Sequence, residues 1–177
     1  EAFNLNALSK SAAIFDIMRL RSFNKEALRA SGADSLLELV SPWFNSAESE
    51  WLVQAISFVK DDAETIKDIV RLISPLMGAM TITPEAEAIL NSSEAIEVVR
   101  PLAKEIEGAK ELNDKSYKNI INVLKKETGR AGKALFMPIR AALTGCASGI
   151  ELNKVMILLG KDNALERIKT VLENRGD

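Results

Sequence analysis

The sequence contains the stretch Gly132-Lys133-Ala134-Leu135-Phe136-Met137-Pro138-Ile139-Arg140-Ala141-Ala142-Leu143-Thr144-Gly145. Its apolar residues favour a helix, with Pro138 just inside the start and Gly145 at the end. Arg140 is the one charge between Leu135 and Leu143, so we expect its side chain to be partly buried and held in place. A fixed guanidinium offers a planar set of hydrogen-bond donors that suits base edges and phosphates.

The helical period continues on both sides of this stretch, and strand alternation is hard to find. We therefore predict an all-α fold, a helical bundle or cage of about eight to ten helices. We predict a boundary near Gly78–Pro84 that divides it into two small subdomains, residues 1–80 and residues 81–177.

Capping residues and helix breakers place individual boundaries. Asp16, Thr83 and Ser92 or Ser93 are predicted N-caps, and Gly129 is a predicted helix end. Further expectations are helix starts at Asp34 or Ser35, at Ser46, near Asp62 and at Asp114, a break or kink at Pro101, two last helices over 151–159 and 164–173 separated by Gly160, and core positions for Trp43 and Trp51.

Composition argues against catalysis within this chain. The 177 residues are 47% hydrophobic, which supports a buried core, and no apolar run approaches the ~20 residues of a membrane span. Histidine is absent, which removes the commonest general base and zinc ligand. The single cysteine, Cys146, fits a reducing, cytoplasmic compartment. We expect no catalytic residue, no metal site and no cofactor in a monomeric chain.

Positive charge gathers in residues 115–140, although the whole chain has a net charge of −2. One interpretation is an ordinary solvated helix face. The other is a surface for phosphates, because four cations converge around Gly129 and Gly132. These four are Lys125, Lys126, Arg130 and Lys133.

The quoted stretch resembles the "GK-x-x-M-P-[LI]-R-x-A-x-T-G" block of bacterial glutamyl-tRNA synthetases. The match continues through Val155–Lys161 and Leu165–Ile168, which look like that family's "[IV]-x-x-L-L-G-K-x-x-x-L-x-R-[LI]" segment. A weaker match covers Leu8–Asp16 and Thr65–Ile69. The catalytic Rossmann domain of that family has no counterpart here. The resemblance therefore implies an anticodon-binding region whose parent enzyme ligates glutamate to tRNA using ATP and Mg.

The resemblance also implies roles for individual residues. Arg140 matches an arginine that contacts the first anticodon base in relatives. A base-packing loop of the family matches Ser148, Gly149, Ile150, Leu152 and Asn153. Relatives often carry an aromatic residue where Asn153 stands.

One position departs from the family pattern. Relatives that discriminate tRNA-Glu from tRNA-Gln tend to carry an arginine that reads the third anticodon base, where this sequence has Asp62. Either Lys60 substitutes for it, or discrimination at that base is lost, and the parent then accepts tRNA-Gln as well as tRNA-Glu. The plainer interpretation is that Asp62 caps a helix.

Two functions from different classes thus remain. The first is tRNA anticodon recognition by a fragment without an active site. The second is a helical protein–protein adaptor whose basic stripe binds an acidic partner.

Overall fold

The computed structural model describes residues 15–44 and 47–175. Within these residues the chain is helical and has no strand. The α-helices are α1 (Ile17–Ala30), α2 (Ala33–Val40), α3 (Ser49–Val59), α4 (Ile66–Ile73), α5 (Pro84–Leu90), α6 (Ser93–Gly108), α7 (Asp114–Thr128), α8 (Lys133–Thr144) and α9 (Leu152–Glu173), and two 3₁₀ turns lie at Ser41–Trp43 (η2) and Ser74–Leu76 (η3). The all-α prediction is confirmed.

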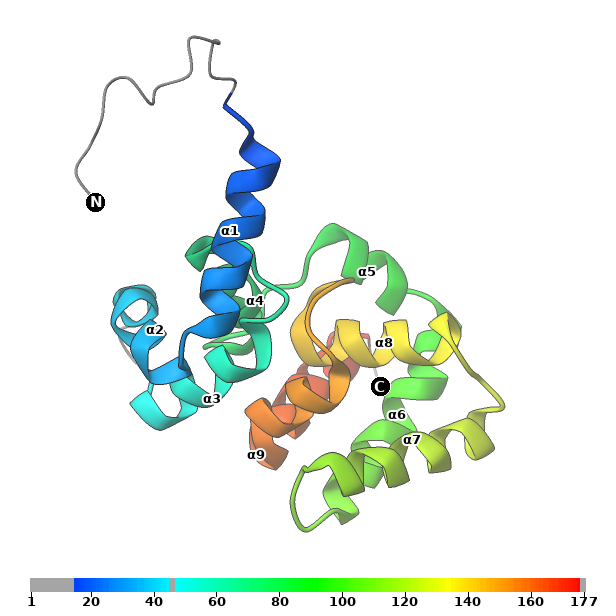
Figure 1. Ribbon diagram of the computed structural model, residues 1–177. Coiled ribbons are helices and arrows are strands. Elements are labelled where there is room, and N and C mark those ends of the chain that lie inside the picture. The colour runs from blue at the N-terminus through cyan, green and yellow to red at the C-terminus, as the bar shows by residue number, and fades with distance from the viewer. Residues whose placement is uncertain (1–14, 45–46, 176–177) are drawn as a thin grey trace, which may run out of the picture.

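The helices gather in two groups, α1–α4 and α5–α9 (Figure 1). In the second group α6 packs against α7, α8 and α9, and in the first α3 packs against α2 and α4. Helix α9 also contacts α3 and η3, so it joins the two groups. The core is continuous across them, from Leu52 and Ile56 in α3 to Met156 and Ile168 in α9.

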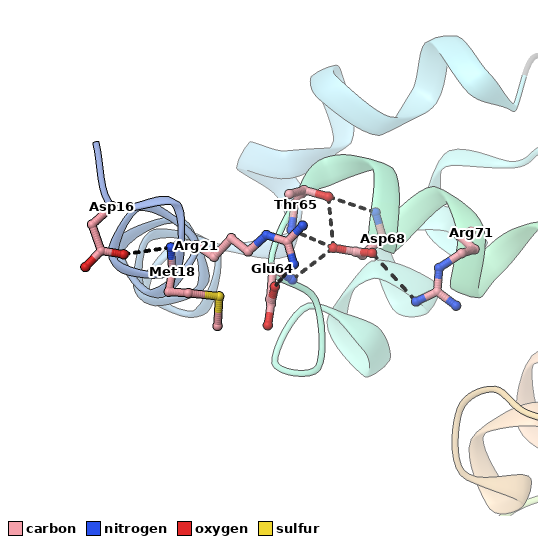
Figure 2. Close-up of polar contacts among 7 residues, drawn as sticks. All are labelled: Asp16, Met18, Arg21, Glu64, Thr65, Asp68 and Arg71. Carbon is pink, nitrogen blue, oxygen red and sulfur yellow. Dashed lines mark hydrogen bonds and ion pairs between the residues drawn. The ribbon is translucent and has the colours of Figure 1, made fainter. Parts of the chain in front are cut away.

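Local chemistry explains most helix starts. Asp16, Thr83 and Ser92 cap α1, α5 and α6 as the sequence predicts. Helix α4 instead begins after Thr65, not near Asp62, because Thr65 and Asp68 form a capping box in which each side chain bonds the other's backbone N–H (Figure 2).

Other predicted boundaries were wrong by a few residues. Asn113 rather than Asp114 caps α7, and Gly32 rather than Asp34 or Ser35 precedes α2. Helix α6 runs through Pro101, because the burial of Val98, Val99, Leu102 and Ile106 outweighs the one backbone bond that proline removes. Pro138 lies in the middle of α8. The predicted caps at Ser46 and most of the resemblance over Leu8–Asp16 fall outside the described residues.

One core prediction failed in the first group, and α1 buries little of its apolar surface. Trp43 lies in η2 with 57% of its surface exposed, so it is not a core residue. Leu28 is the one buried residue among the described positions of α1, where Ile17, Leu20 and Phe23 remain substantially exposed. Trp51 is partly buried, and its Nε1 donates to the carbonyl of Leu158 at 2.8 Å.

Candidate nucleic-acid interface

Arg140 lies on α8 where that helix faces the loop before α9. Its side chain is partly buried, and Nη1 donates to the carbonyl of Ile150 at 2.7 Å. Burial lowers the pKa of the guanidinium, which as an arginine still carries its charge at neutral pH. One N–H is thus used to fix the group, and its other donors have no hydrogen-bond partner among residues 15–44 and 47–175. The sequence prediction of a held, semi-buried arginine is confirmed.

The loop 146–151 wraps closely around this arginine. Gly145 ends α8 in the left-handed conformation, and the Thr144 hydroxyl then accepts from the Cys146 N–H at 3.1 Å. A Cβ on Gly149 would lie 3.3 Å from Arg140 Nη1, so glycine permits the close approach. Ser148 and Gly149 are exposed.

The next residues of the loop divide between core and surface. Ile150 and Leu152 are 6% and 5% exposed, so their side chains lie in the hydrophobic core and not on a base-packing surface. Asn153 is partly exposed, and its Nδ2 donates to Asp114 Oδ1 at 2.8 Å. This bond brings the start of α9 against the start of α7.

Tyr117 on α7 is a further neighbour of Arg140, and the sequence analysis did not single it out. It lies one turn beyond Asp114 on α7 and is partly buried against the core. Burial raises the pKa of its phenol, while the charge of Arg140 acts in the opposite direction and that of Glu151 in the same direction. The chain has this one tyrosine, three residues after a predicted cap, which was the available signal.

The positive charges of residues 115–140 lie in two separate places. Lys125, Lys126 and Lys133 are exposed around the left-handed Gly129 that ends α7, where cations are favoured by the helix dipole. Lys125 lies over the ring of Phe136 at 5.9 Å. Eleven residues separate Asp114 from Lys125, which is about 16 Å along the helix axis. Lys125 and Lys126 therefore lie well away from the end of α7 that Asn153 contacts.

Arg130, the fourth predicted phosphate contact, has other partners. Its two terminal nitrogens bind Glu94 at 2.9 Å and Glu97 at 2.6 Å, and its side chain is 20% exposed. The hydrogen bond that this guanidinium donates to Glu97 is the largest cause that raises its pKa. A cation already held by two carboxylates is a poor phosphate ligand, so we leave it out of the phosphate set.

The turn after α3 carries Lys60 and Asp62. Lys60 Nζ donates to the carbonyl of Arg29 at 2.6 Å, and Arg29 Nε donates back to the carbonyl of Asp61 at 3.2 Å. These bonds tie the turn to the end of α1 and occupy the Lys60 ammonium. Asp62 is exposed and is not a helix cap.

Lys154 brings this turn close to the Arg140 loop. Its Nζ donates to the carbonyl of Phe58 at 3.1 Å and pairs with Glu151 at 3.0 Å. Phe58 is two residues before Lys60, and Glu151 directly follows Ile150. The two predicted base-reading segments, far apart in sequence, therefore lie on either side of one lysine.

The described residues contain neither a metal-binding group nor a membrane-spanning helix. No group of three His, Cys, Asp or Glu residues lies close enough together there to hold a metal ion. None of the helices in residues 15–44 and 47–175 is long and apolar enough to cross a membrane.

The sequence matches a known protein family. Residues 35–172 match the model of the anticodon binding domain. The chain is 34% identical over 184 residues to "Glutamate--tRNA ligase 2" of Syntrophus aciditrophicus and 33% identical over 182 residues to "Glutamate--tRNA ligase" of Bacillus subtilis. These alignments cover 99% and 97% of this chain but 38% of each relative.

Solved structures agree on the fold. A glutamate tRNA ligase from Elizabethkingia meningosepticum, in complex with its amino acid, superposes with a TM-score of 0.80 at 21% identity, over 97% of this chain and 35% of that one. The glutamate-tRNA synthetase of Elizabethkingia anophelis gives 0.77 at 22% identity.

Proposed function

We propose that this chain, which belongs to the anticodon binding domain family, recognises the anticodon of tRNA-Glu for a glutamate–tRNA ligase. The chain spans 38% of the length of the relatives cited above, so the ligation of glutamate with ATP and Mg is proposed for the longer protein. The observation that carries the proposal is Arg140, a charged group fixed by one N–H whose other donors have no partner in the part of the chain that the structure describes. Single-stranded, unstacked bases are the usual target of sequence-specific RNA recognition.

The geometry supports separate tasks for separate residues. Arg140 reads the first anticodon base, with Ser148, Gly149 and Asn153 forming the exposed edge of its loop. Lys125, Lys126 and Lys133 contact phosphates of neighbouring nucleotides. Ile150 and Leu152 support the loop from the core. We retain residues 1–80 and 81–177 as two subdomains of one monomeric, cytoplasmic chain, each contributing one base-reading segment.

Fluorescence anisotropy with anticodon stem-loops of tRNA-Glu, tRNA-Gln and an unrelated tRNA tests this proposal. Arg140→Ala should weaken binding of the tRNA-Glu loop by about 1–3 kcal/mol and relax preference at the first base, the range for a bidentate base contact. Lys125→Ala should weaken all three RNAs alike and lower the salt slope by about 1. Equal binding of all RNAs, or none, would favour an adaptor that binds an acidic protein.

The third anticodon base is a separate proposal that rests on Asp62. An aspartate accepts hydrogen bonds but donates none, so it suits the N1–H and amine of guanine in tRNA-Gln rather than the acceptors of cytosine in tRNA-Glu. If Lys60 read this base in place of the family's arginine, its ammonium would lose the bond to the Arg29 carbonyl. We therefore propose that the longer ligase also charges tRNA-Gln. Its charging of both tRNAs, with and without Asp62→Arg, is the measurement. Strict use of tRNA-Glu in both proteins would contradict this.

A further inference from the structure

Lys154 is the residue through which the first helical group touches the Arg140 loop. It lies in the first turn of α9 with its side chain 25% exposed. Its ammonium donates to the Phe58 carbonyl at 3.1 Å, pairs with Glu151 at 3.0 Å, and lies 6.0 Å from the centre of the Phe58 ring. A partly buried lysine with three such contacts is held in one place.

Local structure explains both partners. Phe58 is in the last turn of α3, where carbonyls lack intrahelical donors and attract a cation. Glu151 occupies the N-cap position of α9, and within the described chain its carboxylate makes no capping bond. It is therefore available to the lysine three residues along. Lys154 thus binds one group from each helix, the Phe58 carbonyl of α3 and the Glu151 carboxylate of α9.

A short chain of contacts leads from this lysine to the base-reading arginine. Lys154 fixes Glu151, whose backbone continues directly from Ile150. The Ile150 carbonyl holds Arg140 Nη1 at 2.7 Å. A displacement of this carbonyl would rotate the guanidinium, because hydrogen bonds weaken steeply as their angle departs from linear. The other tether of the α9 start, from Asn153 to Asp114, stays within the second group.

We infer that Lys154 is a positioning residue for anticodon recognition: it sets the orientation of Arg140 from the end of α3. The inference rests on the proposed function of Arg140. It differs from a phosphate contact, which would raise affinity for every RNA equally. A positioning residue instead changes the ratio of affinities between the correct and the altered first base.

The experiment measures that ratio with two anticodon stem-loops, that of tRNA-Glu and the same loop with its first anticodon base changed. Lys154→Met removes the ammonium and keeps the aliphatic stem. We expect the ratio to fall by about tenfold, equivalent to ~1.4 kcal/mol. Lys154→Arg, which can still donate to both partners, should keep most of it. Lys169→Met, at an exposed position on the same helix, is the matched control and should leave the ratio unchanged.

Glu151→Gln provides a second route that spares the Phe58 contact, and its ratio should fall as well. An unchanged ratio in Lys154→Met and Glu151→Gln overturns the inference, even if the melting temperature or the affinity for both RNAs drops. Wild-type protein that does not discriminate the two loops would refute the proposed role of Arg140, and the inference would fall with it.

Discussion

Arg167 is a buried cation whose removal should be costly. The residue is 7% exposed, on the second half of α9. Its guanidinium donates to three backbone carbonyls, those of Pro75 at 2.7 Å, Leu143 at 2.8 Å and Gly78 at 3.2 Å. Burial is the main cause that lowers its pKa, opposed by the charge of Glu166. The side chain thus joins α9 both to the end of α8 and to the connection between the two helical groups.

The expected cost of Arg167→Met follows from those three bonds. A hydrogen bond to a charged group contributes about 1.5–3 kcal/mol, and a carbonyl left without a donor costs about 1–3 kcal/mol. Methionine fills much of the volume but donates nothing. Against this, the variant no longer has to desolvate a charge, which returns several kcal/mol. We expect a net loss of about 2–4 kcal/mol in the free energy of unfolding.

Urea denaturation followed by circular dichroism measures this loss. Arg71→Met is the matched control, since that arginine has its side chain 69% exposed and pairs with Asp68 at 3.6 Å. We expect it to cost less than about 0.5 kcal/mol. A loss below about 1 kcal/mol for Arg167→Met would show that desolvation cancels the three bonds, and the reasoning would be refuted.

Two further predictions follow from local geometry. Gly145→Ala should cost more than Gly129→Ala in urea denaturation, because both glycines have positive φ but only at Gly145 would the Cβ meet another backbone, 2.2 Å from the Thr81 oxygen; equal costs would contradict this. The Thr65 hydroxyl is the largest cause that lowers the pKa of Asp68 below 3.8 (Figure 2). The stabilisation by this Thr65–Asp68 capping box should therefore be complete above pH 3.8 and be lost as the pH falls through the lower pKa of Asp68 in the folded protein. Thr65→Val should raise that pKa and move the loss to higher pH, which NMR titration of the carboxyl group would show.

The sequence predicts those features that depend on neighbouring residues. Asp16, Thr83 and Ser92 cap helices through their own side chains, and Gly129 ends one through its own backbone, so local pattern suffices. Arg140 was also predictable, because a lone charge in an apolar helix has to be held by something.

Features that depend on partners far away in the sequence could not be predicted in this way. The sequence shows the charge of Arg130 but not that Glu94 and Glu97 would reach it across 36 and 33 residues. Trp43 looks like a core residue until the 3₁₀ turn places it outside. Arg167 did leave a signal: it occupies a core position in the stripe Ala164, Arg167, Ile168 and Val171, where a charge needs buried acceptors.

Gly160 shows how one residue can organise the junction between the two groups. As the sequence predicts, two helices meet at Gly160: α9 spans Leu152–Glu173, and its backbone is non-helical at Gly160 (φ 67°, ψ 175°). Two residues before it, the carbonyl of Leu158 accepts from Trp51 on α3. The interruption allows the two halves of α9 to face different neighbours.

The consequence is that α9 binds the first group at three separated points. Before the interruption, Lys154 binds the Phe58 carbonyl and Trp51 binds the Leu158 carbonyl. Beyond it, Arg167 binds the carbonyls of Pro75 and Gly78. Three separated points of attachment restrict the movement of the two groups relative to each other. If Arg140 and the turn at Asp62 are to read bases of the same anticodon, their separation has to be fixed, and α9 is the element that connects them. The base-reading surface therefore depends on this helix as much as on the residues that would touch RNA.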